Sequence, residues 1–111
     1  MTKREQYGLT FKNFISPVDN SPYNSCVAEN SSVFAELQII RYFDKSEAQR
    51  LIDEIQNAQD GVHFQESIDT RWGAVEDIMI QPPSVNINDV LLIPMQDMKE
   101  LLQEWIAFVS S

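Results

Sequence analysis

The chain has 111 residues, of which 43% are hydrophobic, and its 17 acidic and 8 basic side chains give a formal net charge of −9. This length suits a single domain, residues 1–111, with a buried core, and the hydrophobic content argues against disorder. The negative charge argues against nucleic acid and anionic membranes as partners, because binding to phosphate groups requires positive charge.

The charge is unevenly distributed along the chain. Three of the eight basic residues, Lys3, Arg4 and Lys12, lie among the first twelve residues. From Asn13 onward there are 16 acids and 5 bases, so this part carries a net charge near −11. Such a charge favours a basic protein as partner, and it would equally serve to keep the protein in solution.

Two further features concern where the protein works. Cys26 is the single cysteine, so no intrachain disulfide can form. The first ten residues lack the apolar segment of a secretion signal, and no apolar run approaches the roughly 20 residues that span a bilayer. We therefore expect a cytoplasmic protein without a membrane partner.

The N-terminal quarter of the chain predicts little regular structure. Met1 to Gln6 is polar, and we expect it to be flexible. Tyr7 to Ile15 alternates roughly between apolar and polar residues, which predicts a first strand. Ser16 to Asn24 is dense in Pro, Asn, Ser and Asp, which predicts a loop. A short strand over Cys26 to Ala28 and a turn over Glu29 to Ser32 are expected to follow.

The segment from Val33 to Phe43 has the clearest period of two in the chain, with apolar residues at Ala35, Leu37 and Ile39. This alternation predicts a strand. The last five residues, Ile39 to Phe43, are apolar on both faces, so we expect a central strand that is covered on both sides there.

A helix is predicted to begin at Asp44, which is a favourable N-cap and can form a capping box with Glu47. Gly61 is expected to end this helix, since glycine readily adopts the left-handed conformation after a helix. The apolar face consists of Ala48, Leu51, Ile52, Ile55 and Ala58.

Three strands are predicted next. His63 to Asp69 alternates, Thr70 to Gly73 is a predicted turn, and Asp77 to Gln81 is a second strand. Pro82 and Pro83 should interrupt pairing, because proline cannot donate a ladder hydrogen bond. Val85 and Ile87, which alternate with two asparagines, predict the next strand.

The C-terminal stretch should dominate the core. A short apolar strand, Val90 to Ile93, leads into a helix at Pro94, whose fixed φ suits a first helical turn. Asp97 and Glu100 lie near the positive end of the helix dipole, where negative charge is stabilising. The apolar stripe consists of Met95, Met98, Leu101, Leu102, Trp105, Ile106 and Val109.

These elements together predict an α+β fold: a mostly antiparallel sheet with two amphipathic helices packed on one face, a two-layer sandwich. The other face of the sheet should be covered by the N-terminal segment, exposed to water or used by a partner. Of the N-terminal aromatic residues Tyr7, Phe11, Phe14 and Tyr23, we expect at least two to lie in the core.

The residues indicate no catalytic machinery and no cofactor. His63 is the only histidine, so a zinc site with two histidines and motif-based histidine catalysis are both unsupported. Nothing near Cys26 would lower its pKa, so we expect an inert thiol. The three glycines lie far apart and cannot form a phosphate-binding loop.

One cluster of charged residues flanks the predicted turn at Thr70 to Gly73. Its carboxylates could hold a divalent cation or form a solvated acidic rim, and we favour the rim because the spacing matches no calcium loop. A third interpretation is a protein interface, since Trp and Arg are enriched at binding hot spots and acids attract a basic partner. The candidate partner-binding residues are Glu66, Asp69, Arg71, Trp72, Glu76 and Asp77.

Several C-terminal segments resemble small bacterial immunity proteins of contact-dependent growth inhibition and related polymorphic-toxin systems. The resemblance extends from Cys26 to the end of the chain and contains no catalytic motif. It is carried by Asn86-Ile87-Asn88-Asp89, Leu92-Ile93-Pro94, Lys99 to Trp105, and Phe34 to Phe43 followed by a capped helix.

The resemblance implies an antitoxin role: the protein would bind and neutralise a cognate toxin domain, expected to be a basic nuclease, by stoichiometric occlusion. The alternative is an intracellular adaptor or regulatory binding subunit that pairs through an exposed sheet face. A small metal-dependent hydrolase is the least favoured hypothesis. A homodimer is a further expectation, because a bare sheet face or edge can pair with a second copy.

Overall fold

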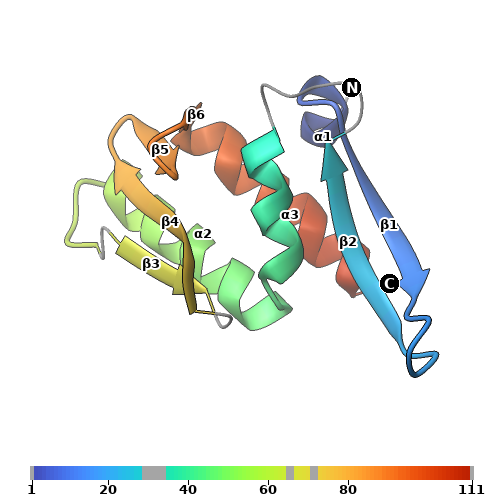
Figure 1. Ribbon diagram of the computed structural model, residues 1–111. Coiled ribbons are helices and arrows are strands. Elements are labelled where there is room, and N and C mark those ends of the chain that lie inside the picture. Colours follow the sequence, from blue (N-terminus) through green and yellow to red (C-terminus); the bar gives the residue numbers. More distant parts are fainter. Residues whose placement is uncertain (1, 29–34, 65–66, 71–72, 111) are drawn as a thin grey trace.

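The computed structural model describes residues 2–28, 35–64, 67–70 and 73–110 (Figure 1). It has a two-stranded sheet and a four-stranded sheet, both antiparallel, and helices packed against them. The predicted α+β class with antiparallel strands is therefore confirmed, although the strands form two sheets rather than one. Figure 1 shows the four-stranded sheet at one end of the molecule and the two-stranded hairpin at the other.

The hairpin consists of β1 (Leu9–Ile15) and β2 (Pro22–Ala28). The Ser16 backbone N–H donates to the Ser21 carbonyl at 2.8 Å, which closes the connecting loop. The predicted first strand is thus present, but β2 begins at Pro22, four residues before the predicted start. Pro22 pairs with Ile15 at the end of the ladder, where a missing N–H costs little.

The chain begins with a short helix, α1 (Lys3–Gln6), where the sequence predicted no element. Thr2 and Glu5 form a capping box at its start. The backbone N–H groups of Lys3 and Arg4 donate to the Glu104 carboxylate at 2.9 and 3.2 Å. This long-range contact between residues a hundred positions apart stabilises a segment that has too few residues to form an independent helix.

The predicted strand at Val33 to Phe43 is wrong. Ala35–Tyr42 forms a 3₁₀ helix, η1, and residues before Ala35 lie outside the described part of the chain. Leu37, Ile40 and Phe43 are all buried and are spaced by three, which is the period of a 3₁₀ helix. Figure 1 shows η1 between the hairpin and the four-stranded sheet, so its apolar residues are covered from both sides.

The second helix, α2 (Lys45–Gln59), confirms the predicted start and end. The Asp44 side chain accepts from the Glu47 backbone N–H at 2.7 Å, and the Glu47 side chain accepts in return from the Asp44 backbone. At the other end Gly61 has a φ of 73°, and the Gly61 and Val62 N–H groups donate to the carbonyls of Ala58 and Asn57. This arrangement is a Schellman motif.

The four-stranded sheet is a meander of β3 (Ser67–Thr70), β4 (Gly73–Gln81), β5 (Ser84–Ile87) and β6 (Leu91–Pro94). Pairing of Gln81 with Ser84 confirms that the two prolines turn the chain. Three strand boundaries differ from the predicted ones. β3 starts after His63 and Phe64, β4 starts at Gly73 within the predicted turn, and β6 is shifted by one residue.

The main helix, α3 (Met95–Val109), begins after Pro94 as predicted. It packs beside α2, and both helices lie behind the four-stranded sheet in Figure 1. Its buried residues are Met95, Met98, Leu101, Leu102 and Trp105, and they face the inner residues of the strands. The inner strand residues are Ile78, Ile80, Val85, Ile87, Leu91 and Ile93.

The far half of α3 extends beyond this sheet and supports the hairpin. Phe11 on β1 contacts Trp105 edge to face, with ring centroids 5.1 Å apart, and lies 5.7 Å from the ring of Phe108. The Trp105 indole N–H donates to the Phe43 carbonyl at 2.9 Å. The N-terminal segment therefore packs on α3 and η1, and does not cover the outer face of the four-stranded sheet.

Candidate interaction surfaces

The predicted partner-binding residues lie on and between β3 and β4. Asp69 belongs to β3, and Glu76 and Asp77 belong to β4, whereas Glu66, Arg71 and Trp72 lie outside the described residues. The side chains of all six lie outside the described part of the structure, so their role stays a prediction. At the backbone, Ile68 pairs with Ile78 and Thr70 pairs with Gly73, so the register shifts at Asp69, and Asp69 and Asp77 lie on adjacent strands without a regular pairing.

The acidic residues are concentrated at this end of the molecule. From Leu51 to Met98, which covers most of α2, the whole four-stranded sheet and the start of α3, there are nine acids and one base, Arg71. Residues 2–28, which form α1 and the hairpin, have three bases and two acids. The net charge thus changes from −8 at the sheet end to +1 at the hairpin end.

Several of these acids are exposed in the described residues. Asp53 and Asp60 lie on the solvent side of α2 and at its C-terminus, and Asp89 lies in the turn between β5 and β6. The Asp89 backbone N–H donates to the Asn86 side chain at 2.9 Å, which helps to hold this turn. Asn88 and Asp89 both have positive φ, which these residue types tolerate better than most.

The outer face of the four-stranded sheet is a second surface. Met79 pairs with Asn86 and Asn86 pairs with Leu92, so these three residues form a row across the strands. The row alternates with the buried inner residues, and the Leu92 side chain is 62% exposed. No described element packs on this face, so it is open to water or to a partner.

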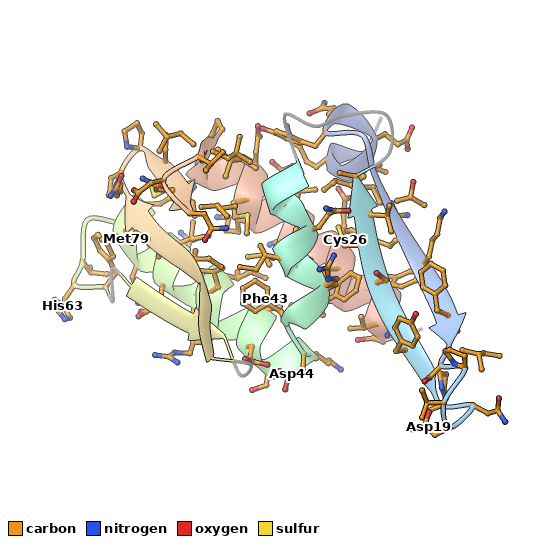
Figure 2. The ribbon with its side chains drawn as sticks, in the orientation of Figure 1. Asp19, Cys26, Phe43, Asp44, His63 and Met79 are labelled. Atoms are coloured by element: carbon orange, nitrogen blue, oxygen red, sulfur yellow. The ribbon has the colours of Figure 1, made fainter. Side chains whose placement is uncertain are left out.

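A third surface is the end of the β1–β2 hairpin, which projects from the body of the molecule (Figures 1 and 2). Four large apolar side chains are exposed here: Phe14 by 37%, Ile15 by 66%, Val18 by 92% and Tyr23 by 48%. The rings of Phe14 and Tyr23 stack with centroids 5.5 Å apart. Of the four N-terminal aromatic residues, Tyr7 and Phe11 pack on the core, which confirms the prediction that at least two would do so. Phe14 and Tyr23 are exposed.

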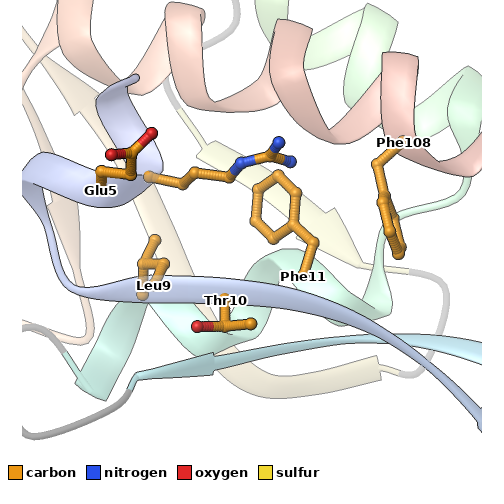
Figure 3. Close-up of a pocket in the computed structure, with 6 residues that line it drawn as sticks. Glu5, Leu9, Thr10, Phe11 and Phe108 are labelled. Carbon is orange, nitrogen blue, oxygen red and sulfur yellow. The ribbon is translucent and has the colours of Figure 1, made fainter. Parts of the chain in front are cut away.

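An open depression of about 300 Å³ lies beside the start of β1 (Figure 3). Polar and apolar side chains line it, and the Arg4 guanidinium lies 5.0 Å from the centre of the Phe11 ring. Its lining residues are Arg4, Glu5, Leu9, Thr10, Phe11 and Phe108. The sequence did not predict this depression, because it depends on α1, which was not expected.

A polar contact fixes α1 and the chain after it to the first turn of α3. The Tyr7 hydroxyl donates to the Asp97 carboxylate at 2.6 Å, and the Lys3 ammonium lies 2.8 Å from the same group. Hydrogen bonds from Lys3 and Tyr7 lower the pKa of Asp97 below its ordinary value, while burial and Asp97 raise the pKa of Tyr7. Asp97 therefore accepts two tertiary contacts besides its favourable place on the helix dipole.

The two residues considered for catalysis have ordinary surroundings. His63 is exposed after α2. Cys26 is fully buried, its thiol donates to the Leu37 carbonyl at 3.8 Å, and burial raises the thiol pKa to about 12. Within residues 2–28, 35–64, 67–70 and 73–110, no three His, Cys, Asp or Glu side chains are grouped to hold a metal ion.

The structure also bears on the membrane. None of the helices in the described segments is long and apolar enough to cross a bilayer.

Comparison with protein-family models, with curated proteins and with solved structures found no match for this chain. The function is therefore argued from its fold, its charge and its surfaces.

Proposed function

We propose that this protein is a toxin-neutralising immunity protein that binds a basic toxin domain, a nuclease by preference, through its acidic sheet end. The observation that carries the proposal is the separation of charge between the two ends of the molecule. A nuclease needs positive charge to hold nucleic acid, and an acidic surface can occupy that site and exclude the substrate.

The proposed contact surface lies at β3 and β4, with Glu66, Asp69, Arg71, Trp72, Glu76 and Asp77 as contacts. The placement of Asp69 on β3 and of Asp77 on the adjacent β4 supports this choice, because acids on neighbouring strands increase the local negative potential. Electrostatic attraction of this kind can raise association rates to about 10⁸–10⁹ M⁻¹s⁻¹ at low salt.

The mode of action would be stoichiometric binding, without a chemical step. A fold with a packed core and capped helices presents a fixed surface, and a fixed surface binds with a smaller entropy loss than a flexible one. The role assigned to the described residues is therefore to hold the acidic edge in place. The compartment proposed for this function is the cytoplasm, where an entering nuclease would have to be inhibited.

The test is a binding measurement with the toxin domain encoded next to this protein's gene. We expect the two purified domains to form a one-to-one complex whose association rate falls steeply as salt increases. Reversing the charges of Asp69, Glu76 and Asp77 to lysine should slow association by about tenfold or more. Protection of cells by this variant at the wild-type level would show that the wrong surface has been chosen.

A matched control separates local from general charge effects. The single changes Asp77→Lys and Asp19→Lys alter the net charge by the same amount, and Asp19 lies in the hairpin loop at the other end. If attraction depends on the sheet end, Asp77→Lys slows association and Asp19→Lys does so much less. Equal effects would mean that only total charge matters.

One observation favours a second candidate, an adaptor or regulatory subunit that pairs through the outer face of the four-stranded sheet. That face carries the row Met79, Asn86 and Leu92 and has no described element on it. Leu92→Lys should abolish binding to such a partner but should leave binding to a basic toxin almost unchanged, so the two candidates can be distinguished.

A further inference from the structure

We propose that two copies of this protein form a symmetric dimer by pairing their β1 strands antiparallel, with Asn13 at the two-fold axis. The proposal goes beyond toxin binding and concerns the opposite end of the molecule. Three observations carry it: the unpaired edge of β1, the exposed apolar residues of the hairpin end, and the depression beside the start of β1.

The first observation is the direction of the backbone groups along β1. The Ser16 N–H donates to the Ser21 carbonyl, so the backbone N–H and C=O of Ser16 point toward β2. In an antiparallel ladder every second residue does the same, so Asn13 and Ile15 direct their N–H and C=O groups to the outer edge. On the other strand, the Ala28 N–H donates to the Gln38 side chain, away from β1, as this alternation requires.

No described element pairs with the outer edge of β1, since the two-stranded sheet contains β1 and β2 alone. Figure 1 shows the outer side of β1 facing away from the rest of the described chain. Four residues of β1, Leu9, Phe11, Asn13 and Ile15, direct their backbone groups to this edge, and exposed apolar side chains lie next to it, which makes a favourable template for another strand. No proline that would block pairing occurs from Leu9 to Ile15, and the one charged residue of the strand, Lys12, is exposed.

The second observation concerns what such pairing would bury. With Asn13 on the axis, Ile15 of one copy lies opposite Phe11 of the other, and their side chains point to the same face of the sheet. That face is the one on which Leu9 and Phe11 pack toward α3. The exposed Ile15 would therefore lie beside the already buried Phe11 of the second copy.

The third observation is that the depression lies where this contact falls. It is lined by Leu9, Phe11 and Phe108 and opens beside β1, as Figure 3 shows. Ile15 of the second copy, and Pro17 after it, would enter this space, which would bury the exposed Ile15 side chain beside the partly buried Phe108. The exposed end of each hairpin thus has a complementary site on an identical chain, as a two-fold interface requires.

Charge argues against a basic partner at this end, and the arrangement of the dimer limits the repulsion between two copies. Residues 2–28 have a net charge of +1, so a basic toxin gains nothing by binding here. Two copies with a net charge of −9 each repel one another, but pairing through the hairpins places the two acidic ends at the greatest separation. The acidic sheet ends would both remain accessible in the dimer.

The primary test compares two substitutions at Asn13 by analytical ultracentrifugation over a range of protein concentrations. Asn13→Pro removes an outward N–H and is tolerated on the unpaired edge of a strand, whereas Asn13→Thr keeps the N–H. Both lose the side-chain hydrogen bond from Asn13 to Asn24, so the pair is matched. We expect wild type and Asn13→Thr to dimerise reversibly, and Asn13→Pro to dimerise at least about tenfold more weakly.

Circular dichroism and thermal unfolding of the two variants show whether the hairpin itself is intact, so a folding defect is separated from a loss of pairing. A wild-type protein that stays monomeric at the highest concentration overturns the proposal. Equal dimerisation by Asn13→Pro and Asn13→Thr overturns it as well, because the outer N–H would then have no part in the contact.

A cysteine pair tests the register. Opposed residues at the axis have Cα atoms about 5.5 Å apart, within reach of a disulfide, so oxidised Asn13→Cys should give a covalent dimer. Val18→Cys is more exposed, but two copies of residue 18 would lie roughly 34 Å apart in this register and should not cross-link efficiently. Faster cross-linking of Val18→Cys than of Asn13→Cys would contradict the register. The native Cys26 is buried and should not interfere.

Salt distinguishes this interaction from the proposed function. Added salt should strengthen the dimer, because it screens repulsion between two acidic copies, and should weaken binding of a basic toxin. Asn13→Pro should still neutralise the toxin, and the lysine variants of Asp69, Glu76 and Asp77 should still dimerise. Dimerisation that salt weakens would contradict the proposed geometry.

Discussion

The hairpin end and the sheet end of this protein are built differently. At the sheet end, α2, α3 and β3 to β6 enclose a core made almost entirely of aliphatic side chains. At the hairpin end, aromatic rings and long-range polar contacts connect α1 and β1 to α3. The sheet end carries a net charge of −8 and the hairpin end +1.

This difference shows how a small fold can separate two tasks. The sheet end has its own continuous core, so its surface can carry a high density of like charge, which costs stability. The hairpin end has only a few packed residues, and a substitution at one of them should have a large local effect. The following predictions test this contrast, from the largest expected change to the smallest.

The largest effect is expected for Trp105→Ala, because Trp105 connects the two ends. Its side chain is buried against Phe11 and donates to the Phe43 carbonyl, so the substitution leaves a cavity and an acceptor without its donor. We expect a loss of about 3–5 kcal/mol in the free energy of unfolding, measured by urea denaturation. A loss below about 1 kcal/mol would mean that the hairpin end contributes little to stability.

A smaller effect is expected for Tyr7→Phe, which removes the hydrogen bond to Asp97 but keeps the ring. At neutral pH we expect a loss of about 1–2 kcal/mol in the free energy of unfolding, since the acceptor is ionised. The pKa of Asp97 is lower in the folded protein than in the unfolded chain. The ionised Asp97 therefore stabilises the fold at pH values above the unfolded-state pKa, and this stabilisation is lost as the pH falls through the folded-state pKa.

The difference between wild type and Tyr7→Phe should therefore shrink as pH falls below the ordinary range of an aspartate. Urea denaturation at a series of acidic pH values measures this difference directly. A difference that stays constant down to the lowest pH at which the protein remains folded would show that the Asp97 charge is not involved.

At the sheet end, Asp44→Ala removes one half of the capping box of α2. We expect a loss of about 1 kcal/mol in the free energy of unfolding, because the Glu47 N–H loses its acceptor. Asp53→Ala is the matched control, since it removes an exposed acid from the middle of the same helix. Equal losses in the two variants would indicate a charge effect and not a capping effect.

The smallest effect is expected for Leu92→Lys on the outer face of the four-stranded sheet. Leu92 is well exposed, so the free energy of unfolding should change by less than about 0.5 kcal/mol. Thermal unfolding of the isolated protein measures this. A destabilisation of several kcal/mol would show that this face is covered in solution.

Features encoded by neighbouring residues were predictable. The capping box at Asp44, the helix end at Gly61, the turn at Pro82 and Pro83 and the helix after Pro94 are all present. Each depends on the side chain or backbone preference of a residue for contacts within a few positions of itself. The alternating pattern also predicted the buried residues of β4 and β5 correctly, which are Ile78, Ile80, Val85 and Ile87.

The 3₁₀ helix at Ala35–Tyr42 was not predictable from the period of two. The same segment also has apolar residues at a spacing of three, and a short apolar segment fits both patterns. What decides between them is its position, since η1 fills the space between the hairpin and the four-stranded sheet. The depression beside β1 and the exposed hairpin end are likewise products of packing.

For the candidate site, sequence reasoning identified a charged cluster, and the backbone places Asp69 and Asp77 on adjacent strands. The interface role of that cluster stays a prediction. Sequence reasoning left open which of the N-terminal aromatic residues are exposed, because Phe14, Ile15 and Tyr23 have the composition of core residues. Exposure of these residues depends on how far the hairpin extends beyond α3, which no local pattern specifies.

By itself, the sequence determined the two amphipathic helices, the antiparallel α+β class and the excess of acid after the first twelve residues, because each follows from contacts between near neighbours or from composition. Only the tertiary structure decided that the strands form two sheets, that Ala35–Tyr42 coils between them, and that charge and exposed apolar surface lie at opposite ends. Those features depend on contacts between residues far apart in the chain, whose free energies are set by burial in the assembled fold.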